Sequence, residues 1–233
     1  MKKLGVVGGL GPMTTVSFMK RVIDMTDATL DQEHIPMVVE HCTKVPDRTA
    51  FILGQSGEDP MPFIIDACRN LEHSGATHIA IPCVTAHYFY EKLIQSVDIP
   101  VYNGIDLCVK EFQRKGITRI GLMATEGTVK SGIFAKPLQE AGIECIEPSE
   151  EHQGFVTDLI YNNVKMGRPV EKEKFEAVAS KLREKGAQSI LLGCTELSVI
   201  ADEWLPEGEF LDMMSVLAKA CVADYATLRE KYR

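Results

Sequence analysis

The chain has 233 residues, 45% of them hydrophobic and 25% charged, which is the usual balance of a globular protein with one or two cores. Its net charge of −8 argues against a nucleic-acid-binding protein, because the lysines and arginines form no basic run. No apolar stretch approaches the roughly 18 residues that a membrane span needs. The short apolar N-terminus meets glycines at once and predicts a first strand, not a secretory signal, so we expect a cytoplasmic protein.

Cysteine and histidine spacing gives no sign of a metal site. The seven cysteines lie at irregular intervals without a C-x-x-C pair, which argues against a zinc finger or a thioredoxin motif. The six histidines likewise show no spacing typical of metal ligands. We therefore expect free thiols, as in a reducing compartment.

Short apolar runs alternate with amphipathic stretches along the whole chain. In chain order, strands are expected at Leu4–Gly8, Met37–His41, His78–Pro82, Val101–Tyr102, Arg119–Met123, Glu144–Glu147 and Ser189–Leu192. Helices are expected at Met13–Thr26, Met61–Ser74, Ala86–Ser96, Ile105–Lys115, Ser131–Ala141, His152–Lys165, Glu171–Lys185 and Met213–Tyr232. Several of these helices are expected to end at a glycine: Gly75, Gly116, Gly142 and Gly186. The alternation predicts an α/β fold with parallel sheets built from βαβ units.

Two segments of the chain follow the same pattern. Ser74–Tyr88 and Lys185–Val199 each contain a Gly-Ala helix stop, an apolar strand, a cysteine at the strand's end and then a threonine that opens a helix. Although βαβ proteins repeat themselves generically, the matched cysteine and threonine favour two related units. We expect two similar α/β halves that face each other, each offering one cysteine.

Ligands of open α/β sheets bind beyond the carboxyl ends of the strands, and four segments here occupy such positions. They are rich in glycine, threonine or cysteine: Gly8–Thr14, Pro82–Thr85, Ala124–Thr128 and Gly193–Glu196. The first is not a dinucleotide fingerprint, because Thr14 stands where G-x-G-x-x-G needs its last glycine, and no Walker lysine follows. We expect its backbone N–H groups to approach a small anion such as a carboxylate, with a plain tight turn as the alternative.

Cys83 and Cys194 are the strongest chemical signal in the sequence. Each follows a buried strand and precedes a helix start, where backbone N–H groups are expected to lower the pKa of a thiol. A matched pair suits racemisation, because one thiolate removes a proton from one face of a carbon and the other thiol returns a proton on the opposite face. Hydrogen-bond donors must then stabilise the charge that develops on the substrate's carboxylate.

The sequence resembles the aspartate/glutamate racemase family over essentially its whole length, and the aspartate racemase branch most. The motifs that carry the resemblance are GGLGP (Gly8–Pro12), PDRTAFIL (Pro46–Leu53), PCVTAH (Pro82–His87), GTVKSGIF (Gly127–Phe134), VKMGR (Val164–Arg168) and LGCTEL (Leu192–Leu197). The glycine motif is weak by itself, whereas the two cysteine motifs with Pro-Asp-Arg upstream of both are specific.

The resemblance implies a fold and an activity. The fold is α/β, with two similar subdomains, each a mostly parallel sheet flanked by helices, and the active site in the cleft between them. We assign residues 1–98 and 208–233 to the first subdomain and residues 99–207 to the second. The implied activity is racemisation of aspartate or glutamate by Cys83 and Cys194, without pyridoxal phosphate, another cofactor or a metal, in a homodimer.

The resemblance also implies a set of substrate-binding residues. Arg48 and Lys165 would lie near the side-chain carboxylate, which an arginine can hold with two hydrogen bonds and a lysine attracts as a point charge. The rest of the expected set comprises Met13, Val84, Thr85, Thr125, Thr128, Thr195 and Glu196. The four threonines among them would lie near the α-carboxylate or the ammonium group.

One position departs from the family pattern. The first cysteine motif of the family reads Pro-Cys-Asn-Thr, but Val84 stands here in place of the asparagine, and its side chain has no polar atom. A hydrogen bond lost in this way costs about 1–3 kcal/mol when a partner is left unsatisfied. The departure leaves open an isomerase or racemase of a related substrate, of the maleate or hydantoin type, and a non-catalytic dicarboxylate-binding protein. A Cys83–His87 dyad for thiol hydrolysis is a weaker alternative.

Overall fold

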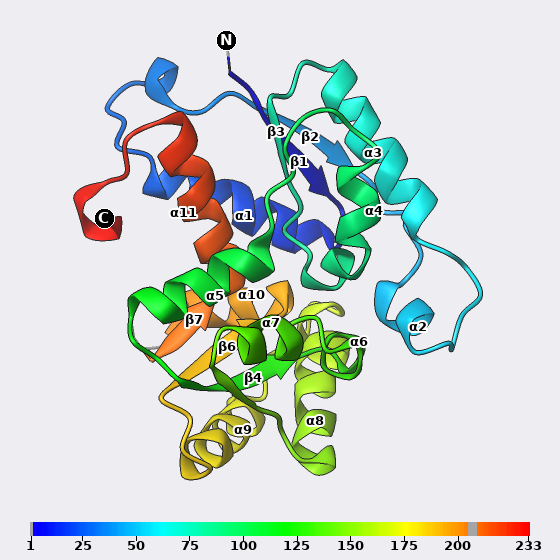
Figure 1. Ribbon diagram of the computed structural model, residues 1–233, viewed down its shortest axis with the longest axis vertical. Helices are drawn as coiled ribbons and strands as arrows, with labels where there is room; N and C mark the ends of the chain where they lie inside the picture. Colours follow the sequence, from blue (N-terminus) through cyan, green and yellow to red (C-terminus); the bar gives the residue numbers. More distant parts are fainter. Residues whose placement is uncertain (1, 205–208) are drawn as a thin grey trace.

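The computed structural model describes residues 2–204 and 209–233, which form two parallel sheets. The order in the first sheet is β2 (Met37–His41), β1 (Leu4–Gly8) and β3 (His78–Ala80). The order in the second is β5 (Glu144–Ile146), β4 (Arg119–Ala124), β6 (Ser189–Gly193) and β7 (Phe210–Asp212). Figure 1 shows the sheets in two halves of the molecule, one above the other. The expected fold class, two parallel-sheet α/β subdomains flanked by helices, is confirmed.

Helices cover both faces of the first sheet. Successive side chains of a strand point to opposite faces. Leu4 and Val6 of β1 therefore share a core with α1 (Pro12–Met25) and α11 (Met213–Tyr225), whereas Val7 shares one with α3 (Met61–His73). All five residues of β1 are buried, which explains why this strand reads as a continuous apolar run.

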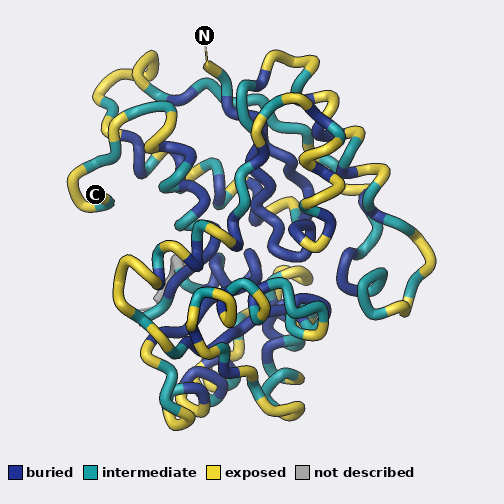
Figure 2. The backbone as a smooth tube through the Cα atoms, in the orientation of Figure 1, coloured by how far each residue is buried: buried dark blue, intermediate teal, exposed yellow. Residues whose placement is uncertain are grey.

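The second sheet is covered in the same way. Ile120 and Leu122 of β4 share a core with α5 (Gly104–Arg114) and α7 (Ala135–Glu140). Met123 faces the other side, towards α8 (Glu150–Thr157), α9 (Lys172–Glu184) and α10 (Thr195–Trp204). Figure 2 shows the buried backbone running through the middle of both halves, with the exposed segments outside.

Two helices carry the chain between the halves. α5 follows Val101, which pairs with Ile79 beside the first sheet, yet Ile105 lies in the core of the second half. α11 follows β7 of the second sheet, yet Leu217 lies in the core of the first half. α5 and α11 also pack against each other, so the two halves share a joint made of crossing helices.

The expected division of the chain stays a prediction. Its second boundary, between residues 207 and 208, lies outside the described residues. β7, which that division groups with the first half, hydrogen-bonds to β6 of the second sheet. The chain therefore returns to the first half only after Asp212.

Several expected helices are divided in the structure. The expected helix Ser131–Ala141 is replaced by α6 (Glu126–Ser131) and α7, because Gly132 between them is left-handed, with φ of 68°. The expected helix Ala86–Ser96 is a 3₁₀ helix, Val84–Phe89, followed by α4 (Tyr90–Ile94). The expected helix His152–Lys165 is α8 continued by a π-helix, Asp158–Val164.

Other differences concern short elements and ends. β7 and α2 (Arg48–Ile52) were not expected, because segments of three and five residues show no readable periodicity. The expected strand Val101–Tyr102 is a single bridge. The last expected helix is α11 followed by a 3₁₀ turn, Glu230–Tyr232, and a further 3₁₀ turn spans Asp31–Glu33. The four helix-ending glycines are confirmed: Gly75, Gly116, Gly142 and Gly186 all have φ between 66° and 93°.

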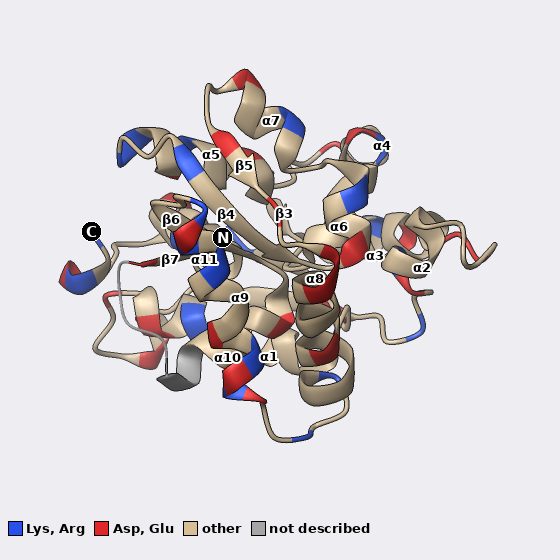
Figure 3. Ribbon diagram, turned by 90° about the horizontal axis from the view of Figure 1, so that it is seen from below, with Lys and Arg blue, Asp and Glu red and all other residues tan. Residues whose placement is uncertain are grey.

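The surface carries charges of both signs. Figure 3 shows lysine, arginine, aspartate and glutamate intermixed on the helices and loops around the second sheet, with the strands largely free of them. Over the described ranges, no helix is both long and apolar enough to cross a membrane.

Candidate active site

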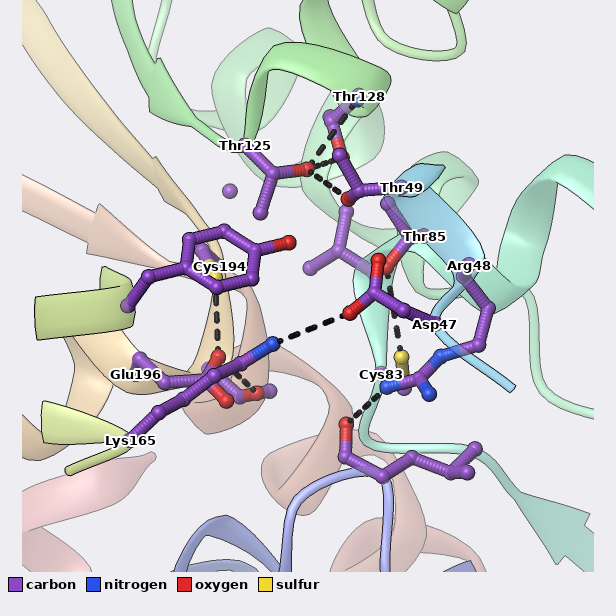
Figure 4. Close-up of a pocket in the computed structure, with 15 residues that line it drawn as sticks. Asp47, Arg48, Thr49, Cys83, Thr85, Thr125, Thr128, Lys165, Cys194 and Glu196 are labelled. Atoms are coloured by element: carbon purple, nitrogen blue, oxygen red, sulfur yellow. Dashed lines mark hydrogen bonds and ion pairs between the residues drawn. The ribbon is translucent and has the colours of Figure 1, made fainter. Parts of the chain in front are cut away.

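One pocket gathers the loops that follow the strands of both sheets (Figure 4). It holds about 10 Å³ of space open to a water-sized sphere, which is room for one water molecule. Its lining residues are Leu10, Asp47, Arg48, Thr49, Cys83, Val84, Thr85, Thr125, Thr128, Tyr161, Lys165, Gly193, Cys194, Thr195 and Glu196. Ten of the eleven residues predicted from the sequence are among them, and only Met13 is not.

The two predicted cysteines lie on opposite sides of this pocket. Figure 4 shows Cys83 at the end of the segment after β3 and Cys194 at the end of β6. Cys83 is 3% exposed and Cys194 6%, so both thiols are screened from bulk water. All seven cysteines lie in the described part of the chain and are free, so no disulfide joins this pair.

The environment of Cys194 differs from the expected one. Its thiol donates a hydrogen bond to Glu196, with 3.0 Å between Sγ and Oε2. Burial raises the pKa of Cys194 well above its ordinary value, and the negative charge of Glu196 raises it further. The prediction that the helix start lowers this pKa is therefore wrong, because desolvation and a carboxylate outweigh the backbone N–H groups.

His87 does not pair with the thiol of Cys83. Its Nδ1 lies 3.0 Å from the backbone oxygen of Cys83, and its Nε2 accepts a hydrogen bond from the N–H of Gly104 at 3.1 Å. Both ring nitrogens are thus occupied by backbone groups. The weaker hypothesis of a Cys83–His87 dyad is wrong.

Arg48 is a buried cation at the wall of the pocket. It is 8% exposed, and its guanidinium donates to the carbonyl oxygens of Leu10 at 3.0 Å and Pro46 at 3.1 Å. Its Nε has no hydrogen-bond partner among the described residues. Burial acts against the charge, but a thiolate at Cys83 and the carboxylate of Asp47 raise the pKa of Arg48 overall. The group therefore stays charged beside Cys83.

Lys165 reaches the pocket from the opposite half. It follows the π-helix, an irregular turn that is often found at functional sites. Its Nζ lies 3.5 Å from Oδ2 of Asp47 and 4.0 Å from the centre of the Tyr161 ring. Burial acts against its charge, but Glu196 and Tyr161 raise the pKa of Lys165 overall.

Threonine hydroxyls line the side of the pocket away from Lys165. Thr49 donates to Thr125 at 3.2 Å, and Thr125 lies 3.0 Å from the hydroxyl of Thr128. This chain of hydroxyls joins α2 of the first half to α6 of the second. Gly127 permits the approach, because a Cβ there would lie 3.0 Å from the Cα of Thr49.

The glycine loop, Gly8–Thr14, lines a second, outer pocket of about 480 Å³. This outer pocket shares Asp47, Arg48, Lys165 and Glu196 with the inner one. Met13 lines this outer pocket and is 67% exposed. The carboxylate that lies near the loop in the structure is that of Glu196, since a Cβ at Gly11 would be 3.6 Å from its Oε1. Glu196 thus stands between the two pockets.

Comparison with known proteins identifies the family. Residues 7–221 match the family described as Asp/Glu/Hydantoin racemase. The chain belongs to this family. Family membership makes the protein an isomerase of the racemase class and confirms the resemblance seen in the cysteine motifs.

Individual relatives extend the similarity over the whole chain. The chain is 28% identical to the broad specificity amino-acid racemase RacX of Bacillus subtilis, over 95% of its own length and 97% of that protein. Its fold matches Picrophilus torridus aspartate racemase with a TM-score of 0.87 and 29% identity, covering 100% of this chain and 98% of the other. The glutamate racemase of Aquifex pyrophilus is 36% identical over 67% of this chain and 61% of that protein.

Five lining residues of the inner pocket were not predicted from the sequence as site residues: Leu10, Asp47, Thr49, Tyr161 and Gly193. Three of them have polar side chains. Asp47 caps α2 by accepting from the N–H of Ala50 at 2.9 Å, and Thr49 lies in that helix. Tyr161 lies in the π-helix. The Pro-Asp-Arg-Thr motif could have indicated Asp47 and Thr49, because both flank Arg48. Tyr161 had no signal, since a tyrosine in an amphipathic helix is typically a packing residue.

Proposed function

We propose that this racemase inverts the Cα centre of an acidic amino acid, aspartate or glutamate, by proton transfer to and from Cys83 and Cys194. The observation that carries the proposal is the chemistry of one pocket. Two free thiols lie on opposite sides of it, and beside them a buried guanidinium, Arg48, has an unpartnered Nε–H. An amino acid with a carboxylate on its side chain uses both features.

The proposed reaction moves two protons. One cysteine, as a thiolate, takes the Cα proton, so that an S–H bond forms as the C–H bond breaks and the electron pair passes into the α-carboxylate. The opposite thiol then gives its proton to the other face of the carbon and becomes a thiolate. One turnover exchanges the protonation states of the two cysteines, and either the reverse reaction or proton exchange with solvent restores them.

Glu196 fits the role of proton acceptor for Cys194. The thiol already donates to its carboxylate, and a thiol with a raised pKa needs an acceptor before it can act as a base. Transfer along this 3.0 Å contact leaves a thiolate at Cys194 and a neutral carboxyl at Glu196. When Cys194 is needed as the acid, the neutral carboxyl returns its proton along the same contact, which restores the thiol and the carboxylate.

The remaining groups suit the two ends of the substrate. Arg48 and Lys165 give the pocket two cations for the side-chain carboxylate. The hydroxyls of Thr49, Thr125 and Thr128 can donate to the α-carboxylate, where the charge develops. The outer pocket, about 480 Å³, shares Arg48 and Lys165 with the inner one, which must widen beyond its room for one water molecule to admit the substrate.

Val84 bears on the choice of substrate. It is 3% exposed and packs in the apolar core of the second half, with Ile105 and Met213 among its cluster. The wall beside Cys83 is therefore apolar where the family pattern has an asparagine. The relative from Bacillus subtilis is described as a broad specificity racemase, so neutral amino acids belong in the test beside the acidic ones.

The test is proton NMR in heavy water with the purified protein and single enantiomers of aspartate, glutamate and several neutral amino acids. We expect the Cα–H signal of an acidic substrate to disappear as the other enantiomer forms. Cys83→Ala and Cys194→Ala should each abolish inversion and leave at most exchange of one enantiomer. Cys145→Ala, in β5 and outside the pocket, is the matched control that should keep the activity.

The outcomes separate the alternatives. The protein could instead react with a hydantoin or with maleate and leave amino acids unchanged. That result would show that the substrate is the related compound and not an acidic amino acid. No exchange with any of these compounds, together with saturable binding of a dicarboxylate, would favour a binding protein and overturn the proposal.

We also propose that the protein works in the cytoplasm as a homodimer. The free thiols are consistent with a reducing compartment, and exposed apolar side chains on α1, among them Met13 and Val16, offer surface for a second copy. Sedimentation velocity at micromolar concentration should give about twice the mass of the 25.8 kDa chain. A monomer at all concentrations would contradict the dimer without affecting the proposed reaction.

A further inference from the structure

A buried histidine links the backbone of Cys83 to a helix that joins the two halves. His87 is 7% exposed and lies in the 3₁₀ helix that begins after Cys83. Because the oxygen of Cys83 can only accept, Nδ1 carries the proton and donates to it at 3.0 Å. Nε2 is then free to accept from the N–H of Gly104 at 3.1 Å. One neutral ring satisfies both contacts at once.

Gly104 is the first residue of α5, where backbone N–H groups lack partners within the helix. Asn103 satisfies the next two, Ile105 and Asp106, through its side-chain oxygen. His87 satisfies Gly104 from outside the helix. It therefore completes the cap of α5 and ties that cap to the turn that holds Cys83.

The contact between His87 and Gly104 lies where α5 and α11, the two helices that connect the halves, begin. A Cβ at Gly104 would lie 2.1 Å from Cε of Met213, the first residue of α11, and 3.3 Å from Nε2 of His87. A Cβ at this position would have to displace the end of the Met213 side chain. The His87 ring, stacked on Tyr90 with 6.2 Å between centroids, thus sits against the joint between the halves.

Ser198 occupies the same sequence position relative to Cys194 as His87 does relative to Cys83, but its hydrogen bond is weaker. Ser198 lies four residues after Cys194, and its hydroxyl is 3.4 Å from the Cys194 oxygen and 2.5 Å from Oδ1 of Asp212. A hydroxyl has a single proton to share between these two acceptors. Asp212 caps α11 itself, by accepting from Met214 and Ser215. The chain therefore offers Ser198 as a natural comparison for His87.

We propose that His87 is a positioning residue, which holds the backbone of Cys83 at the pocket by anchoring it to the first turn of α5. His87 touches neither the thiol nor the substrate site, and its effect on the reaction passes through the backbone of Cys83. The inference rests on the proposed two-thiol reaction only for its catalytic consequence. The anchoring itself is a property of the folded chain and is tested separately.

Hydrogen–deuterium exchange of the backbone tests the anchoring without any substrate. In His87→Ala we expect amides of residues 83–90 and 103–107 to exchange roughly three- to tenfold faster, as the loss of such hydrogen bonds predicts, with residues 190–200 unchanged. Ser198→Ala should leave residues 83–90 unchanged. His87→Asn, whose amide can still donate to the Cys83 oxygen, should restore protection at 83–90 more than at 103–107. Unchanged exchange in His87→Ala, or an equal increase throughout the protein, would overturn the proposal.

The effect on catalysis is measured by comparing two rates for each enantiomer: the rate at which its Cα takes up deuterium and the rate at which it inverts. If Cys83 returns its proton slowly, the enantiomer deprotonated by Cys194 takes up deuterium faster than it inverts. Cys83→Ala identifies that enantiomer. We expect His87→Ala to raise its uptake-to-inversion ratio roughly three- to tenfold, and His87→Asn to raise it less. An equal loss for both enantiomers would show a merely structural role. A wild-type protein that shows no uptake contradicts the proposed function and leaves the exchange test of the anchoring standing.

Discussion

The thiol of Cys194 donates a hydrogen bond to the carboxylate of Glu196, with 3.0 Å between Sγ and Oε2. The other carboxylate oxygen faces the glycine loop, 3.6 Å from the position of a Cβ at Gly11. One carboxylate thus connects the end of β6 with the N-terminus of α1, where the positive end of a helix stabilises an anion. Burial together with this carboxylate raises the pKa of Cys194, so the resting side chain is a thiol.

We expect Glu196→Gln to lower the pKa of Cys194 and to slow racemisation. The pKa falls because a negative charge next to the thiol is removed, while the reaction slows by about 10²-fold because the proton acceptor is lost. Alkylation of Cys194 should therefore begin at lower pH in Glu196→Gln than in the wild type, as followed by mass spectrometry. Glu126→Gln, at a solvent-accessible carboxylate paired with Lys130, is the control. An unchanged pH dependence would contradict the link between Glu196 and the thiol.

Arg48→Lys should weaken the binding of acidic substrates. A lysine cannot reproduce the planar group that donates to Leu10 and Pro46 and still presents a free N–H. We expect kcat/KM for the acidic substrate to fall by roughly 10- to 100-fold, the range for a hydrogen bond to a charged group. Neutral amino acids should be affected much less. The control is Arg69→Lys on the exposed side of α3, and an equal loss for acidic and neutral substrates would contradict the assignment.

Gly127→Ala should disturb the closure of the two halves. The added Cβ would lie 3.0 Å from Cα and 3.1 Å from Cγ2 of Thr49, so α6 and α2 must separate. We expect a loss of stability of about 1–3 kcal/mol and a slower reaction, because the threonine hydroxyls lose their contact across the pocket. Denaturant unfolding and racemisation rates measure both effects. Gly154→Ala in α8 has nothing within 4 Å of the new Cβ and should stabilise the helix by about 0.5–1 kcal/mol.

The stability of the protein should fall in acid through His87. Burial lowers the pKa of this ring, and protonation would remove the acceptor for Gly104. Above the ordinary histidine value of about 6.5 the ring is neutral in both the folded and the unfolded chain. As the pH falls from there towards the lowered pKa, the unfolded chain binds the proton first, and stability is lost by at most about 1.4 kcal/mol per pH unit.

Urea unfolding between pH 7 and pH 5 measures this dependence. His87→Asn cannot take up a proton, so its stability should change less with pH than that of the wild type. His73→Asn, which makes the same substitution at an exposed histidine of α3, is the control for the substitution itself. If the free energy of unfolding changed equally with pH in all three proteins, the His87 ring would have the same pKa in the folded and unfolded chains, which would contradict the prediction. Asp106, whose charge acts on the ring, Tyr90, on which the ring is stacked, and Glu91 and Lys136, which line the same pocket as the ring, are unchanged in every variant.

The sequence by itself determined the architecture and indicated the two cysteines that we propose as the reactive pair. Strands such as β1 and β6 are short, wholly buried apolar runs, so local pattern is enough to predict them. Gly75 ends the helix before β3 and Gly186 ends the helix before β6. Cys194 follows β6 directly, and Cys83 lies shortly after the end of β3. In a parallel sheet the carboxyl ends of the strands meet at one edge, so a residue's place after a strand predicts its place at the pocket.

Only the tertiary structure decided the pKa values of the pocket side chains and the contacts between distant segments around the pocket. The pKa of Cys194 depends on its burial and on how Glu196 turns back towards it, and Arg48 is buried only because the loops of Leu10 and Pro46 close around it. The role of His87 depends on Gly104, which lies 17 residues further along the chain. Such effects come from desolvation and from contacts between distant segments, and neither leaves a periodic pattern in the sequence.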